Sequence, residues 1–140
     1  MKLKNYILIN EGFIKLIGEF TSYRIKPTIA FTLLKLIKEL NQEKQNIEDG
    51  RNNLIKKYGE ETEVEGKQQI SIKNDDKVAI EAFSKEFNEI LNLDFELSIE
   101  NKIDMDCNEI FKHNKEKDAW EPVYLTIGEV VLLSEIINFV

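Results

Sequence analysis

Residues that could carry out acid–base or nucleophilic chemistry are scarce in this chain of 140 residues. The chain contains one histidine, His113, and one cysteine, Cys107. Nucleophilic catalysis needs a serine, a cysteine or a similar group held beside a base, and neither residue lies in such a motif. We therefore interpret His113 as a residue of a surface loop and predict no nucleophilic catalytic site.

The segment DMDCNEIFKHNK begins like a calcium-binding loop, with oxygen-bearing side chains at Asp104, Asp106 and Asn108. A calcium loop of the EF-hand type needs glycine at its sixth position for a sharp turn and a bidentate carboxylate at its twelfth. Glu109 and Lys115 occupy these two positions. The segment therefore predicts no calcium site of this type.

Motifs for phosphate or carboxylate chemistry are also missing from the sequence. The six glycines are isolated, and none begins the glycine-rich turn between a strand and a helix that binds phosphate groups. Acidic residues are plentiful, but a catalytic pair needs a defined separation and a cleft that shifts its pKa values, which spacing along the chain does not supply. We predict a protein that is not an enzyme and that uses no cofactor or metal ion.

The net charge of −7 is unevenly distributed along the chain. Residues 1–40 contain seven lysines and arginines against three glutamates, whereas residues 41–140 contain twelve bases against 23 acids. Nine acids and two bases lie between Glu81 and Glu109. A protein that neutralises nucleic-acid phosphates needs the opposite sign of charge, so we predict no direct nucleic-acid binding. This acidic segment is either a solvated surface or a substitute for phosphates that a protein partner recognises.

Length and composition indicate one domain, residues 1–140. With 42% apolar residues the chain can form a real core, because a domain of this size buries roughly 68% of its unfolded surface. The first residues, MKLKNYILINEGF, hold a short apolar run that Asn and Glu interrupt, so we predict neither a signal peptide nor a membrane span. One cysteine cannot form an internal disulfide and suits a reducing compartment. We therefore expect a cytoplasmic protein.

The spacing of apolar residues predicts four helices. The first follows Asn10, a typical N-cap residue, and the second begins at Pro27, which suits a first helical turn. The second helix should reach Tyr58, with Gly59 as its end, a length of roughly 45 Å at 1.5 Å per residue. The other two are expected near residues 75–91, capped by Asp75 or Asp76, and near residues 126–138, where Thr126 and Glu129 have the spacing of a capping box.

Alternating apolar and polar residues predict strands between these helices. The segment EETEVEGKQQISIK has the pattern of a β-hairpin that turns at Gly66, LDFELSIE at residues 93–100 predicts a strand with its acids outward, and DAWEPVYL adds an edge strand. The combination predicts an α+β fold: a long helical hairpin of residues 10–58 packed on a small, mainly antiparallel sheet, with two further helices. We expect one core to contain Phe83, Phe87, Phe95 and Leu97.

The long helix has two rows of apolar residues along one side, and only one of them stays apolar over its second half. A half-filled seam favours contact with one light partner, either the antiparallel helix of a hairpin or the same helix of a second subunit. We therefore predict that residues 41–58 project from the domain. Gly50 leaves open an alternative, a helix broken by a loop around EDGRNN. The apolar row is Leu33, Leu40, Ile47 and Leu54, and the companion row that turns polar is Ala30, Ile37, Lys44, Arg51 and Tyr58.

Several segments occur in an order that matches a known family. LIKKYGE ends the long helix, EFNEILNLDFEL joins a helix to a strand, and LTIGEVVLLSEII lies near the C-terminus. In these features the chain resembles a family of small proteins of unknown function from tailed phages and prophages of Gram-positive bacteria. The segment NKIDMDCNEIFKHNKEKDAWEPVY departs from the family pattern. The resemblance implies a phage origin and hence the cytoplasm of the host cell, and it implies no catalytic residues.

These observations support two hypotheses of function, both of them based on protein binding. The first is a stoichiometric inhibitor of a host defence system, which binds through its acidic surface or through the projecting helix. The alternative is a phage assembly or scaffolding factor that self-associates, as a homodimer, through the long helix. On either hypothesis we expect Ile47→Asp to leave the monomer folded and to weaken the contact. The predicted partner-binding residues are Leu40, Lys44, Ile47, Arg51 and Leu54 on the helix, and Asp94, Glu96 and Glu100 on the acidic surface.

Overall fold

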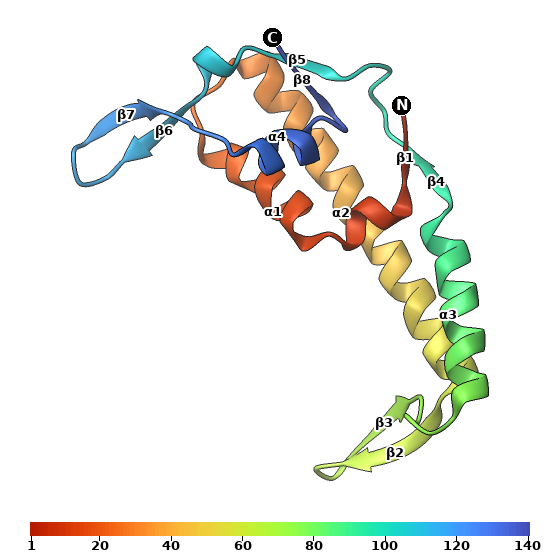
Figure 1. Cartoon of the computed structure of the whole chain (residues 1–140). Helices are drawn as coiled ribbons and strands as arrows, with labels where there is room; N and C mark the ends of the chain where they lie inside the picture. Colours follow the sequence, from red (N-terminus) through yellow and green to blue (C-terminus); the bar gives the residue numbers. More distant parts are fainter.

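Helix α2, Pro27–Tyr58, runs the length of the molecule, and the other elements pack along it (Figure 1). The computed structural model describes residues 1–140. Near its start α2 packs against α1, Glu11–Glu19, and its second half packs against the antiparallel α3, Lys77–Leu91. Helix α4, Ile127–Leu133, packs on α1. We call residues 1–40 and 92–140 the head, and residues 41–91 the arm.

The continuity of α2 follows from strong local signals at both ends. Pro27 lies in the first turn, where a backbone N–H would have no partner within the helix, and its fixed φ suits the helix. Lys56 and Lys57 lie in the last turn, where positive charge interacts favourably with the helix dipole. The helix ends at Gly59 as predicted and is unbroken at Gly50, so the alternative of a loop around EDGRNN is wrong.

Side-chain caps define where the other helices begin. The Asn10 side chain accepts a hydrogen bond from an amide in the first turn of α1, and the Asp76 side chain does the same for α3. Thr126 and Glu129 form the reciprocal bonds of a capping box, both 3.1 Å long, at the start of α4. These caps confirm the starts that the sequence predicted.

The strands pair two by two, so the structure contains four small sheets rather than one. Three pairs are antiparallel and one is parallel, in keeping with the predicted α+β class, which is confirmed. The pairs are β1 (Lys2–Lys4) with β4 (Asp94–Glu96), β2 (Glu60–Val64) with β3 (Lys67–Ser71), β6 (Phe111–Asn114) with β7 (Ala119–Pro122), and, in parallel, β5 (Ile103–Met105) with β8 (Ile137–Phe139).

Two predicted elements are shorter than expected. The strand predicted over residues 93–100 forms only at β4, where β1 provides three paired residues. The helix predicted over residues 126–138 ends at Leu133, and the chain continues into β8. Ile136 and Ile137 are buried, and β8 bonds to β5, so the last apolar residues gain more contact as a strand than as further helix.

The β2–β3 hairpin extends from the end of the arm, and the β6–β7 hairpin extends from the head (Figure 1). The β2–β3 turn lies at Glu65 and Gly66, whose φ values of 52° and 76° fall in the left-handed region. Two consecutive positive φ values are typical of the hairpin turns that match strand twist, and glycine adopts them without strain. The predicted turn at Gly66 is confirmed.

The main core lies in the head, and its edge reaches into the arm. Phe95 and Leu97 are buried in it, and Phe87 of α3 packs against it, as predicted. Phe83 stacks on Phe87, with ring centroids 5.7 Å apart, but does not belong to the core. The prediction was wrong for Phe83 because α3 leads away from the head along α2, which places this ring one turn farther out.

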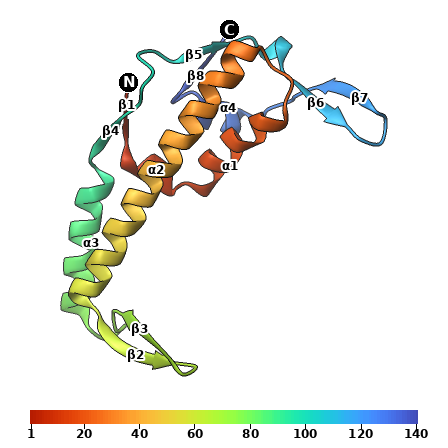
Figure 2. The same ribbon diagram turned by 180° about the vertical axis from the view of Figure 1, so that it is seen from behind.

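The second half of α2 extends past α1 and α4, and α3 lies along one side of it in both views (Figures 1 and 2). The partner of the half-filled seam is therefore the antiparallel helix of a hairpin within the same chain. Ile47 is only 3% exposed and belongs to the core, contrary to our expectation that it lies outside. Leu40 is also buried.

Candidate functional site

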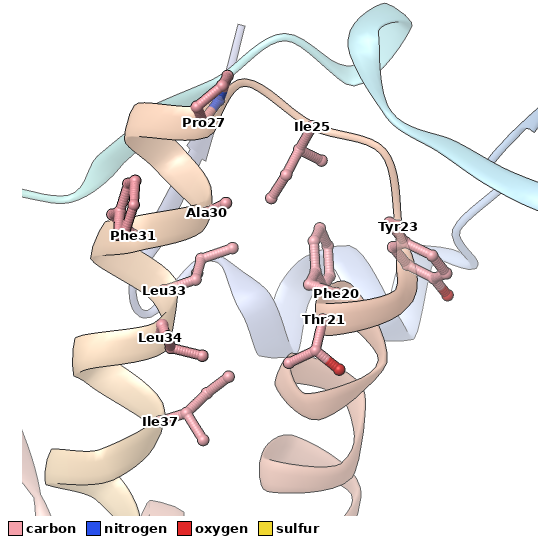
Figure 3. A pocket seen from close by; sticks show the side chains of 10 residues that line it. All are labelled: Phe20, Thr21, Tyr23, Ile25, Pro27, Ala30, Phe31, Leu33, Leu34 and Ile37. Carbon is pink, nitrogen blue, oxygen red and sulfur yellow. The ribbon is translucent and has the colours of Figure 1, made fainter.

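An apolar groove lies in the head, between the end of α1 and the start of α2 (Figure 3). Its volume is about 260 Å³, and eight of its ten lining residues are hydrophobic. Phe20 and Leu33 are buried at the groove, whereas Phe31 is 71% exposed and Leu34 is 49% exposed. The lining residues are Phe20, Thr21, Tyr23, Ile25, Pro27, Ala30, Phe31, Leu33, Leu34 and Ile37.

The groove exists because the α1–α2 layer is covered on one side only. Helix α4 packs on α1 and lies in front of the two helices in one view and behind them in the opposite view (Figures 1 and 2). All lining residues come from residues 20–37, so no other element closes the groove. The short helix η2, Phe20–Ser22, and the extended loop after it hold the two helix ends apart.

Polar groups at the groove are already bonded within the chain. The Thr21 hydroxyl donates to the Gly18 carbonyl at 2.7 Å, and the Tyr23 hydroxyl donates to the Glu19 carboxylate at 3.5 Å. Burial raises the pKa of Tyr23, and the negative charge of Glu19 raises it further, so this hydroxyl keeps its proton. Figure 3 shows the Tyr23 oxygen pointing away from the groove. The groove thus offers apolar contact rather than acid–base chemistry.

Basic residues surround this apolar surface. Residues 20–38 contain four bases, Arg24, Lys26, Lys35 and Lys38, and no acid. Lys26 is paired with Glu109, 2.8 Å away, and this bond raises the pKa of Lys26. The other three form no ion pair. Lys35 and Lys38 follow exposed apolar residues by four positions, which makes them neighbours on the helix surface.

The predicted partner-binding residues of α2 do not form one accessible surface. Leu40 and Ile47 are buried within the chain, Lys44 and Leu54 are half-buried, and Arg51 is exposed. The buried pair packs in the core of the monomer and cannot reach a partner without unfolding it. Of these five residues only Arg51 is fully exposed to solvent.

The acidic residues predicted to bind a partner are exposed, but two of them face lysines. Asp94 lies opposite Lys4 in the β1–β4 pair, with an ion pair of 2.9 Å, and Glu96 lies opposite Lys2. Glu100 is exposed and forms no ion pair. The lysines of β1 interrupt the negative surface, which weakens its likeness to a row of phosphates.

The residues with catalytic chemistry lie apart from the groove. His113 Nε2 is 3.0 Å from Asp118 Oδ1, and its ring lies 5.2 Å from the Trp120 ring on the β6–β7 hairpin. The Cys107 thiol lies 3.9 Å from the carbonyl of Val140. The chain contains no group of three histidine, cysteine or acidic side chains placed to hold a metal ion. The sequence predicts no catalytic role for His113 or Cys107, and this stays a prediction.

Comparison with known proteins does not assign the chain to a family. Protein-family models, curated proteins and solved structures all give no match. The resemblance to phage proteins therefore stays a prediction. None of the helices combines the length and the apolar character that crossing a membrane requires. The groove and its charges are thus the basis for a functional proposal.

Sequence reasoning missed the groove, although the sequence held a signal for it. PTIAFTLLKLI, at the start of α2, is apolar nearly all round, whereas a helix covered on one side needs a single apolar stripe. Pro27, Ala30, Phe31 and Leu34 form a second stripe beside the buried one. This second stripe indicates a second contact, but spacing alone does not show whether the chain itself provides it.

Proposed function

We propose that this protein acts by binding a helix of another polypeptide in the groove of residues 20–37, without catalysing a reaction. The exposure of Phe31 and Leu34 beside the buried Phe20 and Leu33 carries this proposal. Large apolar side chains gathered at a hollow on the surface of a folded domain mark binding sites for proteins or ligands. The two side-chain hydroxyls that line the groove are bonded within the chain, which favours an apolar protein surface as its occupant.

The structure of the groove walls favours a helix over an extended strand. One wall is helix α2, whose backbone N–H and C=O groups bond to each other, and the other is the short helix η2 with the loop of residues 23–26. In this loop, the Arg24 backbone is paired in both directions with Phe111 of β6, at 2.7 and 3.1 Å. An extended peptide would therefore lose backbone hydrogen bonds on entering the groove, whereas a helix brings its own.

The length of the groove sets the size of the helix. The lining of α2 runs from Pro27 to Ile37, which is about 15 Å at 1.5 Å per residue. Such a span matches about three helical turns, with apolar anchors at positions i, i+3 or i+4, and i+7. Because Lys35 and Lys38 flank the groove, acidic residues beside these anchors would strengthen binding and steer it.

The two roles predicted from the sequence differ in the origin of this helix. In the inhibitor role, the helix belongs to a host defence protein, which the bound chain blocks. In the assembly role, it belongs to a structural or assembly protein of a phage. The sequence placed the partner at the acidic residues 81–109 or on the long helix, whereas the present proposal places it in the groove for both roles.

Capture of the partner by groove variants tests the proposal. The tagged protein is incubated with lysates of uninfected and phage-infected Gram-positive cells, and retained proteins are identified by mass spectrometry. Phe31→Glu and Leu34→Glu should each weaken retention about tenfold or more, because a buried apolar anchor contributes roughly 2 kcal/mol. Val78→Glu is the matched control, since Val78 is an exposed apolar residue of α3 outside the groove.

The origin of the retained protein separates the two roles. A defence effector points to inhibition, and a capsid or tail protein points to assembly. Cross-linking from a photoreactive residue placed at position 31 should then reach a helix of that partner, and the same group at position 78 should not. Equal retention by wild type and both groove variants would show that the groove is not the binding site.

A further inference from the structure

A second cavity lies in the head, at the base of the β6–β7 hairpin (Figure 1). Its volume is about 490 Å³, and seven of its nine lining residues are hydrophobic. It shares no lining residue with the groove of residues 20–37. We call this cavity the hairpin pocket. Its lining residues are Cys107, Asn108, Ile110, Pro122, Val123, Tyr124, Leu125, Val130 and Phe139.

Four separate segments of the chain form the walls of the hairpin pocket. The short helix η3, Cys107–Glu109, forms one wall together with Ile110, and the chain that leaves β7 forms another. Val130 of α4 and Phe139 of β8 complete the lining. A hollow with walls in several directions surrounds a small molecule, whereas an uncovered helix face meets only one side of it.

Backbone hydrogen bonds hold these walls in place. The Val123 amide donates to the Ile110 carbonyl at 3.0 Å, which ties the chain after β7 to the chain before β6. The Val130 amide donates to the Thr126 carbonyl at 3.0 Å in the first turn of α4, and β8 is paired with β5. Sites for small molecules are usually formed before the ligand arrives, and these bonds give the hairpin pocket that property.

The lining determines which charge a ligand can have. It contains no aspartate, glutamate, lysine, arginine or histidine. A charged group that entered the pocket would lose its water and gain no oppositely charged partner, which disfavours binding. The Asn108 amide and the Tyr124 hydroxyl can each exchange a hydrogen bond with a polar atom of the ligand. The pocket therefore suits an uncharged and largely apolar molecule.

The volume and the aromatic walls determine the size and shape of the ligand. An apolar cavity of about 150 Å³ holds one benzene molecule, so about 490 Å³ admits a molecule of two or three rings. Tyr124 is 84% exposed, which places its ring at the mouth of the pocket, and Phe139 is half-buried in the wall. Aromatic ligands gain stacked or edge-to-face contacts with such rings.

We propose that the hairpin pocket binds an uncharged aromatic small molecule of two or three rings. This site is distinct from the groove, and the inference does not depend on the proposed binding of a helix there. The groove is smaller, and Lys35 and Lys38 flank it, which suits a protein segment with acidic residues. The hairpin pocket is larger and has no charged lining, which suits a small molecule.

Fluorescence titration with N-phenyl-1-naphthylamine tests this inference, because this probe is uncharged, has three rings and becomes brighter in apolar surroundings. Its fluorescence should rise with protein concentration and saturate. Cys107, the one cysteine of the chain, lines the pocket and reports whether the probe occupies it. The probe at saturation should slow alkylation of Cys107 by N-ethylmaleimide about fivefold or more, because a bound molecule blocks access to the thiol. The sulfonated probe 1-anilinonaphthalene-8-sulfonate, at the same concentration, should not slow it.

Substitutions on α4 locate the probe. Val130→Asp places a charge in the pocket and should weaken binding of N-phenyl-1-naphthylamine about tenfold or more. Val131→Asp is the matched control, because Val131 is the next residue of the same helix, is 63% exposed and does not line the pocket. Tyr124→Ala, a change at an exposed residue, should weaken binding severalfold and replaces Val130→Asp if that variant does not fold. Phe31→Glu, in the groove, should bind the probe like wild type.

Three results overturn the inference. The first is a fluorescence signal that does not rise and saturate with wild-type protein. The second is an alkylation rate of Cys107 that the uncharged probe leaves unchanged. The third is binding that Phe31→Glu abolishes, or that Val130→Asp and Val131→Asp weaken equally, because the probe then lies outside the hairpin pocket.

Discussion

Gly50 of α2 faces Ile90 of α3: a Cβ atom added at Gly50 would lie 3.3 Å from Ile90 Cδ1. An interior glycine costs a helix about 1 kcal/mol relative to alanine, and this cost was the ground for considering a broken helix. The contact shows that the glycine instead leaves room for α3 beside an unbroken α2. Packing between α2 and α3 therefore explains why a glycine occupies this position, although helix propensity disfavours it.

We expect Gly50→Ala to change the free energy of unfolding by less than about 1 kcal/mol, because the gain in helix propensity is offset by crowding of Ile90. Gly50→Val should destabilise the protein by about 1–3 kcal/mol through overpacking. Urea denaturation measures both. Gly18→Ala in α1 is the control, since a Cβ atom there meets nothing within 4 Å. A larger stabilisation by Gly50→Ala than by Gly18→Ala would contradict the contact.

Ile47→Ala should destabilise the protein by about 2–5 kcal/mol, because it leaves a cavity in the core. Ile47→Asp should go further and unfold most of the protein, because it buries an unpaired charge. This outcome reverses the expectation from the sequence, in which the aspartate variant stays folded. Thermal melts followed by circular dichroism measure the effect, with the exposed Arg51→Ala as control. A normal melt for Ile47→Asp would show that this residue is not buried in the core.

The Asn5 side chain joins the head to the end of α3, where its Nδ2 donates to the Ile90 carbonyl at 2.9 Å. Asn5→Ala should cost about 1 kcal/mol, the usual net value of one hydrogen bond. Asn5→Asp should cost about 3 kcal/mol or more at neutral pH, because a carboxylate at this buried position would face a carbonyl oxygen. Chemical denaturation of both variants checks the order. The same amide-to-acid change at Asn53, an exposed residue, should cost less, and an equal cost would argue against the specific bond.

The ion pair between Lys57 and Glu86 makes the stability of the arm depend on pH. Lys57 Nζ lies 2.9 Å from Glu86 Oε1, and this bond is the largest cause of the lowered pKa of Glu86. A carboxyl group whose pKa is lowered in the folded state stabilises that state at pH values above the unfolded pKa, here 4.5. This contribution is lost as the pH falls through the folded pKa.

Glu86→Gln should therefore lower the urea midpoint at pH 7 and have little effect at pH 3, where the wild-type carboxyl is protonated too. High salt at pH 7 should narrow the difference between the two proteins, because the pair is exposed to solvent. Glu89→Gln, a neighbouring acid of α3 that forms no ion pair, is the control. If the urea midpoints of wild type and Glu86→Gln differ by the same amount at both pH values, the charge of Glu86 does not contribute to stability.

The sequence by itself determined the local structure, because the signals for that structure lie within a few residues. Asn10, Asp76 and the pair Thr126 and Glu129 mark helix starts through bonds to amides two or three positions away. Gly66 marks a hairpin turn because few other residues adopt its φ. The alternation of helical and strand periods was enough to predict the α+β class. The half-filled seam predicted an antiparallel helix of a hairpin as one of two possible partners but did not show that this helix is α3.

Only the tertiary structure decided which apolar residues remain free to bind a partner. Ile47 and Phe31 both lie at apolar positions of α2, but Ile47 is buried in the core, whereas no element covers Phe31. The same limit applies to the last residues, which form β8 rather than more helix because β5, more than thirty residues earlier, offers a strand to pair with. Burial depends on which distant elements pack together, and a periodic pattern along one helix contains no information on what lies opposite it.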